Sequence, residues 1–325
     1  MIQAGIIGGA GYTAGELIRI LLNHPKVEMN FIYSTSNAGN YLYEVHQDLL
    51  GSTDLKFTKK INLEVDVLFL CLGHGNSIKF LEKNAFSKNT KIIDLSQDFR
   101  LANDAVFQNK NFVYGLPELQ KELIKKAKNI ANPGCFATAI QLALLPLAHA
   151  QLLQSAVHIN ATTGATGVGV TPGATTHFSW RNNNFSVYKA FTHQHLGEIN
   201  ESLKKVQTSF HKELFFIPNR GNFARGIFAS VYLDFDKSLE EAYNLYENFY
   251  EDASFTHLSK NPIHLKQVVN TNNCVIHLEK YQNKLLIASV IDNLLKGASG
   301  QAVQNMNLLF GFDETEGLKL KATAF

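Results

Sequence analysis

Short apolar runs alternate with stretches of helical periodicity along the first third of the chain. Residues 4–8, AGIIG, form an apolar run that ends in glycine, and apolar residues then recur at helical spacing from Ala14 to Leu21. Similar runs predict further strands at 27–33, 65–72 and 90–96, with a helix at 78–85. Nearly continuous apolar strands that alternate with helices predict a parallel sheet covered on both faces.

The pattern changes at about residue 163. Turns rich in Gly and Thr follow, then an alternating strand at 226–235 and a helix rich in aromatic residues at 239–250. These features are typical of a mixed α+β domain. The expected fold class is therefore α/β, with an N-terminal Rossmann-type parallel sheet and a second, mixed α+β catalytic domain.

Composition agrees with a two-domain globular protein and excludes several classes. The 325 residues are 45% hydrophobic, which suffices for a large core. A net charge of +2 without long runs of one sign argues against a nucleic-acid partner. The three cysteines, Cys71, Cys135 and Cys274, form no C-x-x-C pair, so we expect no metal site, no disulfide framework and a cytoplasmic location. No signal peptide or membrane span is expected either.

The segment GGAGYTAG, residues 8–15, follows the first predicted strand. A dinucleotide site needs glycine where the chain turns and where its backbone approaches the pyrophosphate, and it needs the N–H groups of the next helix. Gly8 and Gly11 fill these two roles, and Ala14 takes the third position, where only close helix packing is required. A simple glycine turn at the end of a first strand is the alternative interpretation.

The second predicted strand ends in YSTSNAG, where a cofactor with a free ribose 2′-OH would be met by Asp or Glu. Ser34, Ser36 and Asn37 offer neutral hydrogen-bond donors there, and no carboxylate is present to repel a 2′-phosphate. The segment thus favours NADP over NAD, although an ordinary polar turn would have the same composition.

Cys135 lies in NPGCFATA, directly after Pro-Gly and before an almost wholly apolar helical stretch. A thiolate is the nucleophilic form of cysteine, and the partial positive charge of a helix N-terminus lowers the pKa of a thiol. Cys135 is therefore the candidate nucleophile. Cys71 and Cys274 lie within apolar strand-like segments and are expected to be inert core residues.

A cysteine nucleophile usually works with a proton-transfer partner, and the segment THQHLGEIN offers one. His193 and His195 stand two residues apart, and Glu198 follows His195 by three. If a helix begins here, Glu198 shares a face with His195 and can orient it. The same residues would also suit a polar helix start with no catalytic role.

Several segments together resemble the N-acetyl-γ-glutamyl-phosphate reductases, within the aspartate-semialdehyde-dehydrogenase and glyceraldehyde-phosphate-dehydrogenase-like group. They are GGAGYTAGEL (8–17), IDLSQDFRL (93–101), YGLPEL (114–119), IANPGCFATAIQLALLP (130–146), HQHLGEI (193–199) and KGASGQAVQNMNLLFG (296–311). The chain departs from the family pattern at Ala14, where glycine is common. It also lacks the basic residue that many members carry after Ser36.

The resemblance implies that an acyl phosphate is reduced to an aldehyde with NADPH. Cys135 would form a thioester, and His195, or less favourably His193, would exchange a proton with the oxyanion while Glu198 orients it. The implied cofactor contacts are Gly8, Gly11, Tyr12, Thr13, Ser34, Ser36, Asn37, Gly73, His74, Gly75 and Gly300. The implied substrate contacts are Arg100, Asn132 and Arg225. Arg181 and Arg220 are further arginine candidates for binding the substrate's phosphate or carboxylate.

The same resemblance implies a dinucleotide-binding domain from residues 1–134 and 297–325, and a catalytic and oligomerisation domain from 135–296. The expected protein is a cytoplasmic homo-oligomer, a dimer or tetramer, that acts on a small-molecule acyl phosphate. Two alternatives stay open. One is a related reductase with an aspartyl or aminoadipyl substrate, and the other is a nonenzymatic nucleotide sensor in which Cys135 only packs. The acyl group on the glutamyl amine, acetyl or succinyl or another, is left open too.

Overall fold

A computed structural model describes residues 1–324 of the chain. The backbone divides into two compact units. The first comprises Met1–Pro133 and Ala298–Lys319, and the second comprises Gly134–Gly297 and the residues from Leu320 onward. The sequence-based boundaries placed 297–325 with the first domain. The backbone N–H groups of Thr323 and Ala324 instead donate to the carbonyls of Val269 and Lys266 in the second unit.

The first unit contains a sheet in the order β2-β1-β3-β4-β7-β6-β5. Its strands are β1 (Ile2–Ile7), β2 (Val27–Tyr33), β3 (Val67–Leu70), β4 (Lys91–Asp94), β5 (Val106–Phe107), β6 (Lys110–Tyr114) and β7 (Asn129–Ala131). All neighbours pair in parallel except β5 and β6. The side chains of β3 are completely buried, as expected for a strand covered on both faces.

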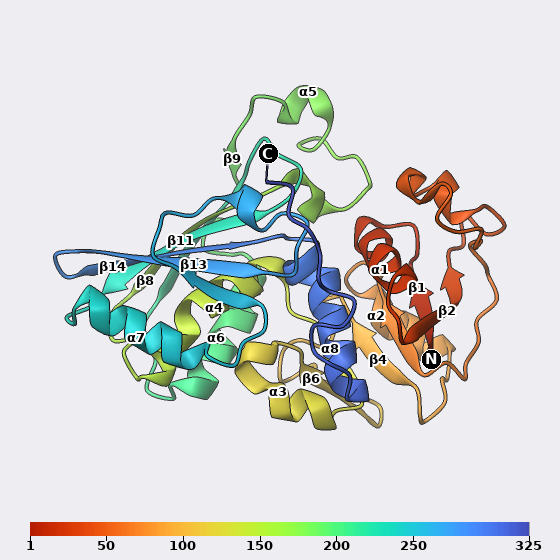
Figure 1. The fold of residues 1–325 in the computed structure, drawn as a ribbon, viewed down its shortest axis with the longest axis horizontal. Helices are drawn as coiled ribbons and strands as arrows, with labels where there is room; N and C mark the ends of the chain where they lie inside the picture. The colour runs from red at the N-terminus through yellow and green to blue at the C-terminus, as the bar shows by residue number, and fades with distance from the viewer. Residues whose placement is uncertain (325) are drawn as a thin grey trace. The chain divides into compact units, whose positions relative to one another are not determined.

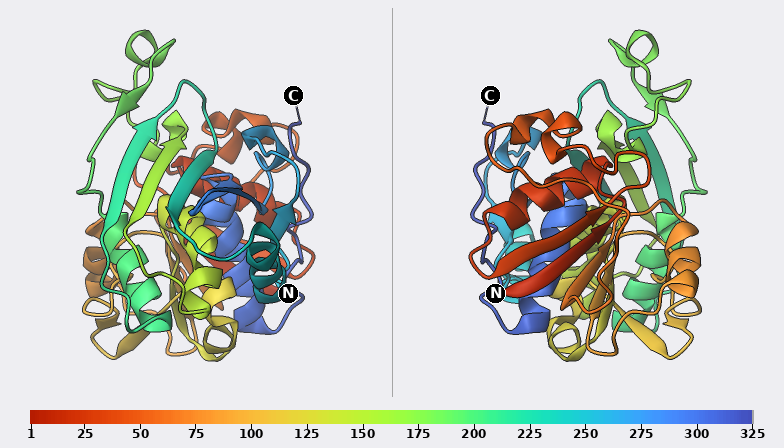
Figure 2. Two further views of the ribbon diagram at one scale, coloured as in Figure 1. Left: turned by 90° about the vertical axis from the view of Figure 1, so that its left-hand side faces the viewer. Right: turned by 90° about the vertical axis from the view of Figure 1, so that its right-hand side faces the viewer.

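Four helices belong to this unit: α1 (Tyr12–Leu22), α2 (Asn76–Lys83), α3 (Pro117–Lys126) and α8 (Gly300–Phe310), together with the short 3₁₀ turns η1 (Leu42–Glu44) and η2 (Gln47–Leu49). The late segment α8 packs against both α1 and α3, and Figures 1 and 2 show it, in blue, beside elements from the start of the chain. The amide of Asn305 on α8 donates to the carbonyl oxygen of Gly115 at 2.8 Å. The first unit is therefore assembled from two separate parts of the sequence.

The second unit contains a mixed sheet in the order β12-β13-β14-β11-β8-β10-β9. Its strands are β8 (Val157–Thr163), β9 (Ser186–Val187), β10 (Leu214–Arg220), β11 (Ile227–Asp234), β12 (Thr256–Ser259), β13 (Cys274–Tyr281) and β14 (Lys284–Ile291). β8 pairs with β10 and β12 with β13 in parallel, and the other neighbours are antiparallel. Buried and more exposed positions alternate along β11, so this strand shows the period that its sequence predicts.

The remaining helices are α4 (Cys135–His149), α5 (Phe178–Arg181), α6 (His195–Val206) and α7 (Leu239–Phe249), with η3 (Ala165–Val168), η4 (Leu265–Gln267) and the π-helical turn η5 (Leu295–Ser299). From Phe136 to Ala148 every residue of α4 is buried, against α6, α7, β11 and β14. Pro146 lies inside this helix and supplies no N–H to the carbonyl of Leu142, which accepts a hydrogen bond from the Tyr250 hydroxyl instead.

The observed architecture confirms the predicted fold class. Strand β2 has the predicted bounds, whereas β3 and β4 are shorter than the apolar runs that contain them. Among residues 1–324 no helix is long and apolar enough to cross a membrane. Within the same residues no group of three or more His, Cys, Asp or Glu side chains is arranged to hold a metal ion.

Candidate active site

Cys135 is the first residue of α4, and Gly134 before it forms the N-cap in an extended conformation (φ −72°, ψ 151°). The N–H of Thr138 donates to the Gly134 carbonyl oxygen at 2.8 Å, so the helix begins at the cysteine. Residues Cys135 and Cys71 are both partly exposed, whereas Cys274 is buried. Burial raises the pKa of the Cys71 thiol far above its usual range. The partly exposed thiol at a helix N-terminus is thus Cys135.

Glu198 connects the start of α4 with the start of α6. Its Oε2 accepts the N–H of Gly134 at 2.9 Å, and its Oε1 lies 3.9 Å from Nε2 of His195. Both side chains are almost fully buried, with exposed fractions of 4% for Glu198 and 8% for His195. One buried carboxylate therefore contacts both the imidazole and the peptide that precedes the thiol.

His193 lies beside His195 but in a more apolar environment. The two rings are 4.6 Å apart between centroids, and the N–H of His195 donates to Nδ1 of His193 at 3.3 Å. The His193 ring also packs edge-on against Phe136 and Phe216. Burial, assisted by the nearby Lys189 ammonium, lowers the pKa of His193 to about 4. His193 is consequently neutral near pH 7.

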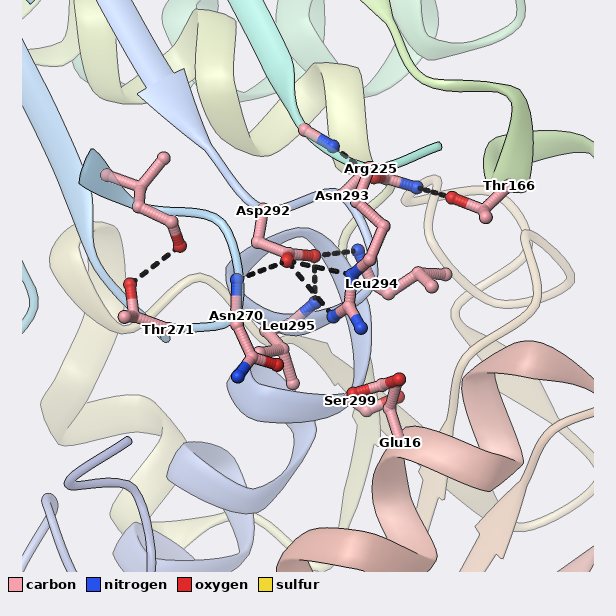
Figure 3. A network of polar contacts seen from close by, with 12 residues as sticks. Glu16, Thr166, Arg225, Asn270, Thr271, Asp292, Asn293, Leu294, Leu295 and Ser299 are labelled. Atoms are coloured by element: carbon pink, nitrogen blue, oxygen red, sulfur yellow. Dashed lines mark hydrogen bonds and ion pairs between the residues drawn. The ribbon is translucent and has the colours of Figure 1, made fainter. Parts of the chain in front are cut away.

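Asp292 organises the turn that contains Gly297, and Figure 3 shows the hydrogen bonds of its carboxylate. Its Oδ1 accepts the N–H groups of Leu294 and Leu295, which caps the π-helical turn that follows. The backbone N–H of Gly297 donates to the Asp292 carbonyl at 2.9 Å. A Cβ on Gly297 would lie only 2.7 Å from Cβ of Cys135, so glycine is required for this approach.

Arg225, a predicted substrate contact, takes part in the same network. Its Nε and Nη2 both lie 3.0 Å from Oδ2 of Asp292, and Oδ2 also accepts the N–H of Asn270 at 2.7 Å. The neighbouring Asn293 accepts the N–H of Gly226 and donates to Thr166 (Figure 3). The structure thus shows Arg225 paired with a fully buried carboxylate.

In the first unit the glycine turn after β1 is tightly constrained by its neighbours. Gly8 has φ +84°, and a Cβ there would lie 2.5 Å from the Cys71 carbonyl oxygen. The N–H groups of Gly8 and Gly9 donate to the Tyr33 carbonyl, and His46 Nε2 lies 2.8 Å from the Gly9 carbonyl oxygen. Gly11 is the N-cap of α1. The turn is thus fixed in a form that only glycine permits at residue 8.

The first turn of α1 contains Tyr12 and Thr13, whose N–H groups precede the first intrahelical hydrogen bond, from Gly15 to Gly11. The polar turn after β2 lies at the same edge of the sheet, because β1 and β2 are parallel neighbours. There the Asn37 amide donates to the Ser36 hydroxyl at 3.0 Å and to the Ser34 hydroxyl at 3.4 Å. Ser34 is buried and Ser36 is exposed.

The exposed GHG segment, Gly73 to Gly75, follows β3 at this edge. Asp98 holds its end, since its carboxylate accepts the N–H groups of Gly75 at 2.6 Å and Ser77 at 3.0 Å. Nδ1 of His74 accepts the N–H of Gln97. The amides at the start of α2 are therefore bonded to a protein carboxylate.

Arg100 and Asn132, the predicted substrate contacts in the first unit, form hydrogen bonds with other residues of the same unit. Arg100 donates from Nε to the Asn132 carbonyl at 2.8 Å and from Nη2 to the Leu95 carbonyl at 3.0 Å. The Asn132 amide donates to the Ala298 carbonyl and accepts from Asn305. Gly300 is the first residue of α8, directly after Ser299, whose hydroxyl donates to the Thr13 carbonyl.

Two residues near the histidine pair were not in the predicted site. Tyr188 packs against His193, with ring centroids 5.8 Å apart, and Arg220 lies over the Tyr188 ring. Arg220 was one of four arginine candidates, but nothing in the sequence ranked it first. Tyr188 follows strand β9, which is only two residues long, so periodicity gave no signal for it.

Comparison with known proteins places this geometry in context. Two family models match the chain: the semialdehyde dehydrogenase NAD binding domain over residues 3–127 and the semialdehyde dehydrogenase dimerisation domain over residues 135–293. The N-acetyl-γ-glutamyl-phosphate reductases of Christiangramia forsetii and Flavobacterium johnsoniae are 64% and 62% identical to it, over the full length of both chains. The chain belongs to the N-acetyl-γ-glutamyl-phosphate reductase family.

The fold of this N-acetyl-γ-glutamyl-phosphate reductase family member is shared with more distant solved structures. Aspartate semialdehyde dehydrogenase II from Vibrio cholerae has a TM-score of 0.73 at 16% identity, covering 96% of this chain and 99% of that one. The aspartate semialdehyde dehydrogenase of Candida albicans, solved with NADP, has a TM-score of 0.66 at 14% identity, covering 95% and 98%. The predicted family is thus confirmed, and the NAD-binding family model identifies a nicotinamide cofactor.

Proposed function

We propose that this chain is an NADP-dependent reductase that converts an N-acyl-γ-glutamyl phosphate to the N-acyl-glutamate semialdehyde in arginine biosynthesis. The observation that carries the proposal is the full-length identity of 57–64% to relatives named N-acetyl-γ-glutamyl-phosphate reductase. The site supports it, because the partly exposed Cys135 begins α4 beside a His–Glu pair.

Cys135 is the nucleophile of this proposal. Its thiolate attacks the acyl carbon, phosphate leaves with the C–O bonding pair, and a thioester remains on sulfur. A nicotinamide cofactor, when bound, would supply the hydride that this carbon accepts. The resulting thiohemiacetal collapses to the aldehyde and returns the thiolate, so one acyl phosphate, one hydride and one proton give one aldehyde and one phosphate.

His195 is the proton-transfer residue, giving a proton to the developing oxyanion and recovering it when the thiohemiacetal collapses. The carboxylate of Glu198, 3.9 Å from Nε2, orients the ring. His193 suits this role less well, because burial lowers its pKa to about 4 and its Nδ1 accepts the His195 N–H. Its role in the proposal is to position His195.

The first unit holds the dinucleotide in this proposal. The Gly8–Gly11 turn and the first N–H groups of α1, at Tyr12 and Thr13, receive the pyrophosphate. A Cβ at Gly8 would lie 2.5 Å from the Cys71 carbonyl oxygen, whereas a Cβ at Gly11 would meet only the Gly8 carbonyl oxygen, at 3.8 Å. The backbone beside Gly11 is therefore open to a phosphate, and the residues present fit the group. The GHG segment and Gly300 complete the contacts to the cofactor.

NADP is preferred over NAD because Ser34, Ser36 and Asn37 after β2 carry donors and no carboxylate. Without an arginine in that turn, the preference is smaller than a bidentate clamp would give. Arg100, Asn132 and Arg225 remain proposed substrate contacts, each held in place by its own hydrogen bonds.

The assembled protein is proposed to be a cytoplasmic homo-oligomer, in agreement with the dimerisation family model.

The proposed activity is tested by comparing turnover of N-acetyl and N-succinyl glutamyl phosphates with turnover of aspartyl and aminoadipyl phosphates, measured as NADPH oxidation. Preference for a glutamyl substrate supports the proposal and identifies the acyl group. Preference for another acyl phosphate would assign a sibling reductase. No turnover, together with a Cys135 that resists alkylation at all pH values, would favour a nonenzymatic nucleotide sensor.

A further inference from the structure

The strand pair β9–β10 brings a tyrosine and an arginine together beside the histidine pair. Arg220 is the last residue of β10 and lies opposite Ser186 of β9. One residue beyond β9, the N–H of Tyr188 donates to the Pro218 carbonyl at 3.1 Å. The Arg220 guanidinium carbon consequently lies 4.4 Å from the centroid of the Tyr188 ring, in cation–π contact.

The pair adjoins the reactive groups of the second unit. The Tyr188 ring lies 5.8 Å from that of His193, which in turn lies 4.6 Å from that of His195. Burial, and next the charge of Cys135, raise the pKa of Tyr188 to about 12, while Arg220 lowers it. Arg220 also contributes to the low pKa of His193. The guanidinium is thus within electrostatic reach of the histidine pair.

The charge of Arg220 lacks a compensating acid. Among residues 1–324 no carboxylate forms an ion pair with it, and its Nε is buried without a hydrogen-bond acceptor. A second guanidinium is close, since Arg181 donates to the Arg220 carbonyl at 2.7 Å. Arg181 is 5% exposed, and its guanidinium donates to the carbonyls of Thr175, Asn184 and Arg220 and to the Ser186 hydroxyl, all of which are neutral.

Two guanidinium groups without acidic partners leave an excess of positive charge in a partly desolvated region. Burying a charge costs free energy unless it is paired, so such a region favours an anion. Arg225, another candidate arginine, differs in this respect, because it is bonded to the Asp292 carboxylate.

We infer that Arg220, supported by Tyr188 and Arg181, binds an oxyanion of the substrate, a phosphate or a carboxylate, next to the Cys135 site. The inference rests on the proposed function, whose substrate carries both kinds of group. Arg220 presents its guanidinium to the oxyanion, the Tyr188 ring fixes the guanidinium plane, and Arg181 holds the backbone of Arg220 in place.

The test measures the reverse reaction of the full chain, with inorganic phosphate, NADP⁺ and the N-acetyl or N-succinyl glutamate semialdehyde, for wild type, R220Q and R220K. R19Q is the matched control, because Arg19 pairs with Asp48 on the surface of the first unit. R220Q loses a charge-assisted pair of hydrogen bonds to the oxyanion, so we expect it to raise the KM of the reactant that carries this oxyanion by about 10- to 100-fold. R220K should have a KM between those of wild type and R220Q. NADP⁺ affinity and Tm are measured alongside to confirm that each variant is folded.

Comparing the KM values of the different reactants shows which oxyanion Arg220 binds. A raised KM for phosphate alone assigns the leaving group, a raised KM for both semialdehydes assigns the shared α-carboxylate, and a raised KM for the succinyl compound alone assigns the acyl carboxylate. If every KM of R220Q stays within twofold of wild type, or if kcat alone falls, the inference is wrong while the proposed function stands. If R220Q does not fold, the same criteria apply to R220K, for which unchanged KM values overturn the inference. A folded wild type without activity on any of these compounds overturns the proposed function itself.

Discussion

Replacing Glu198 by glutamine tests how one buried carboxylate serves both the fold and the chemistry. The change keeps the size of the side chain and removes its charge. In the wild type Oε2 accepts the Gly134 N–H at 2.9 Å, and Oε1 lies 3.9 Å from the His195 ring nitrogen. E198Q therefore weakens two interactions at once, and each has its own measurable consequence.

The effect on stability follows from the Gly134 hydrogen bond. A bond to a charged acceptor contributes about 1.5–3 kcal/mol and a neutral one about 0.5–1.5 kcal/mol, so the loss is about 1–2 kcal/mol. For a domain of this size each kcal/mol lowers Tm by about 2–4 °C. We expect a drop in Tm of about 2–8 °C in E198Q, and a larger one in E198A, where the buried N–H has lost its acceptor.

The effect on turnover follows from the contact with His195. Two unit charges about 4 Å apart interact with about 4 kcal/mol at an effective dielectric constant of about 20, which is an upper limit because the glutamine amide keeps a dipole. We expect kcat of E198Q to fall about 10- to 100-fold, with NADPH affinity unchanged. Steady-state kinetics and a thermal melt of the same preparation measure both effects.

The control is E201Q, on the exposed side of the same helix, which should leave kcat and Tm near their wild-type values. An E198Q variant with a lower Tm but wild-type kcat would show that Glu198 only accepts the Gly134 hydrogen bond. A variant with unchanged Tm would refute the stability argument instead.

Three further predictions concern the nucleophile, the cofactor and pH. C135S should keep NADPH binding, measured by fluorescence titration, but lose nearly all turnover, and H195N should slow turnover by about 10²–10⁴-fold, more than H193N does; the reverse order for the histidines would exchange their roles. S36D should reduce kcat/KM for NADPH relative to NADH through charge repulsion at the exposed end of β2, and an unchanged ratio would show that the 2′-phosphate is read elsewhere. Burial raises the pKa of Asp94 to about 6, above its unfolded value. The stabilising contribution of the protonated Asp94 to the free energy of unfolding is therefore complete below about pH 4 and is lost as the pH rises through about 6. Urea unfolding should therefore show that the free energy of unfolding of wild type falls by up to about 3 kcal/mol relative to that of D94N between about pH 4 and 7. Parallel plots of this free energy against pH for the two proteins would contradict the prediction.

The amino-acid sequence alone was sufficient for the framework of the first unit. Its strands β1, β3 and β4 are mostly buried and lie within apolar runs, and β2 has the bounds that its segment predicts. Backbone requirements are local as well. Gly8 needs φ +84° wherever the rest of the chain lies, and Pro-Gly before Cys135 starts a helix in the expected place.

Elements with a weaker pattern were not predicted individually. β7 has three residues and β5 and β9 have two, so no period of alternation can establish itself in them. Their positions depend on pairing with longer neighbours. The return of residues 323 and 324 to the second unit likewise rests on hydrogen bonds to a distant turn, which has no sequence signature.

The tertiary structure alone decided which charged groups are paired. The sequence indicated Arg100 and Arg225 as substrate contacts and Arg181 and Arg220 as further candidates. The fold gives Arg225 the carboxylate of Asp292, and it gives Arg100 and Arg181 backbone carbonyls. Among residues 1–324, Arg220 lies over the Tyr188 ring and Arg181 over the Trp180 ring, and neither forms an ion pair with an acid. The register of β9 and β10 brings Tyr188 to Arg220. Local sequence indicates backbone conformation and the pattern of apolar positions, since these depend on near neighbours in the chain. The partner of a charge depends on strand register and helix packing between residues far apart in the chain, and only the folded structure specifies these.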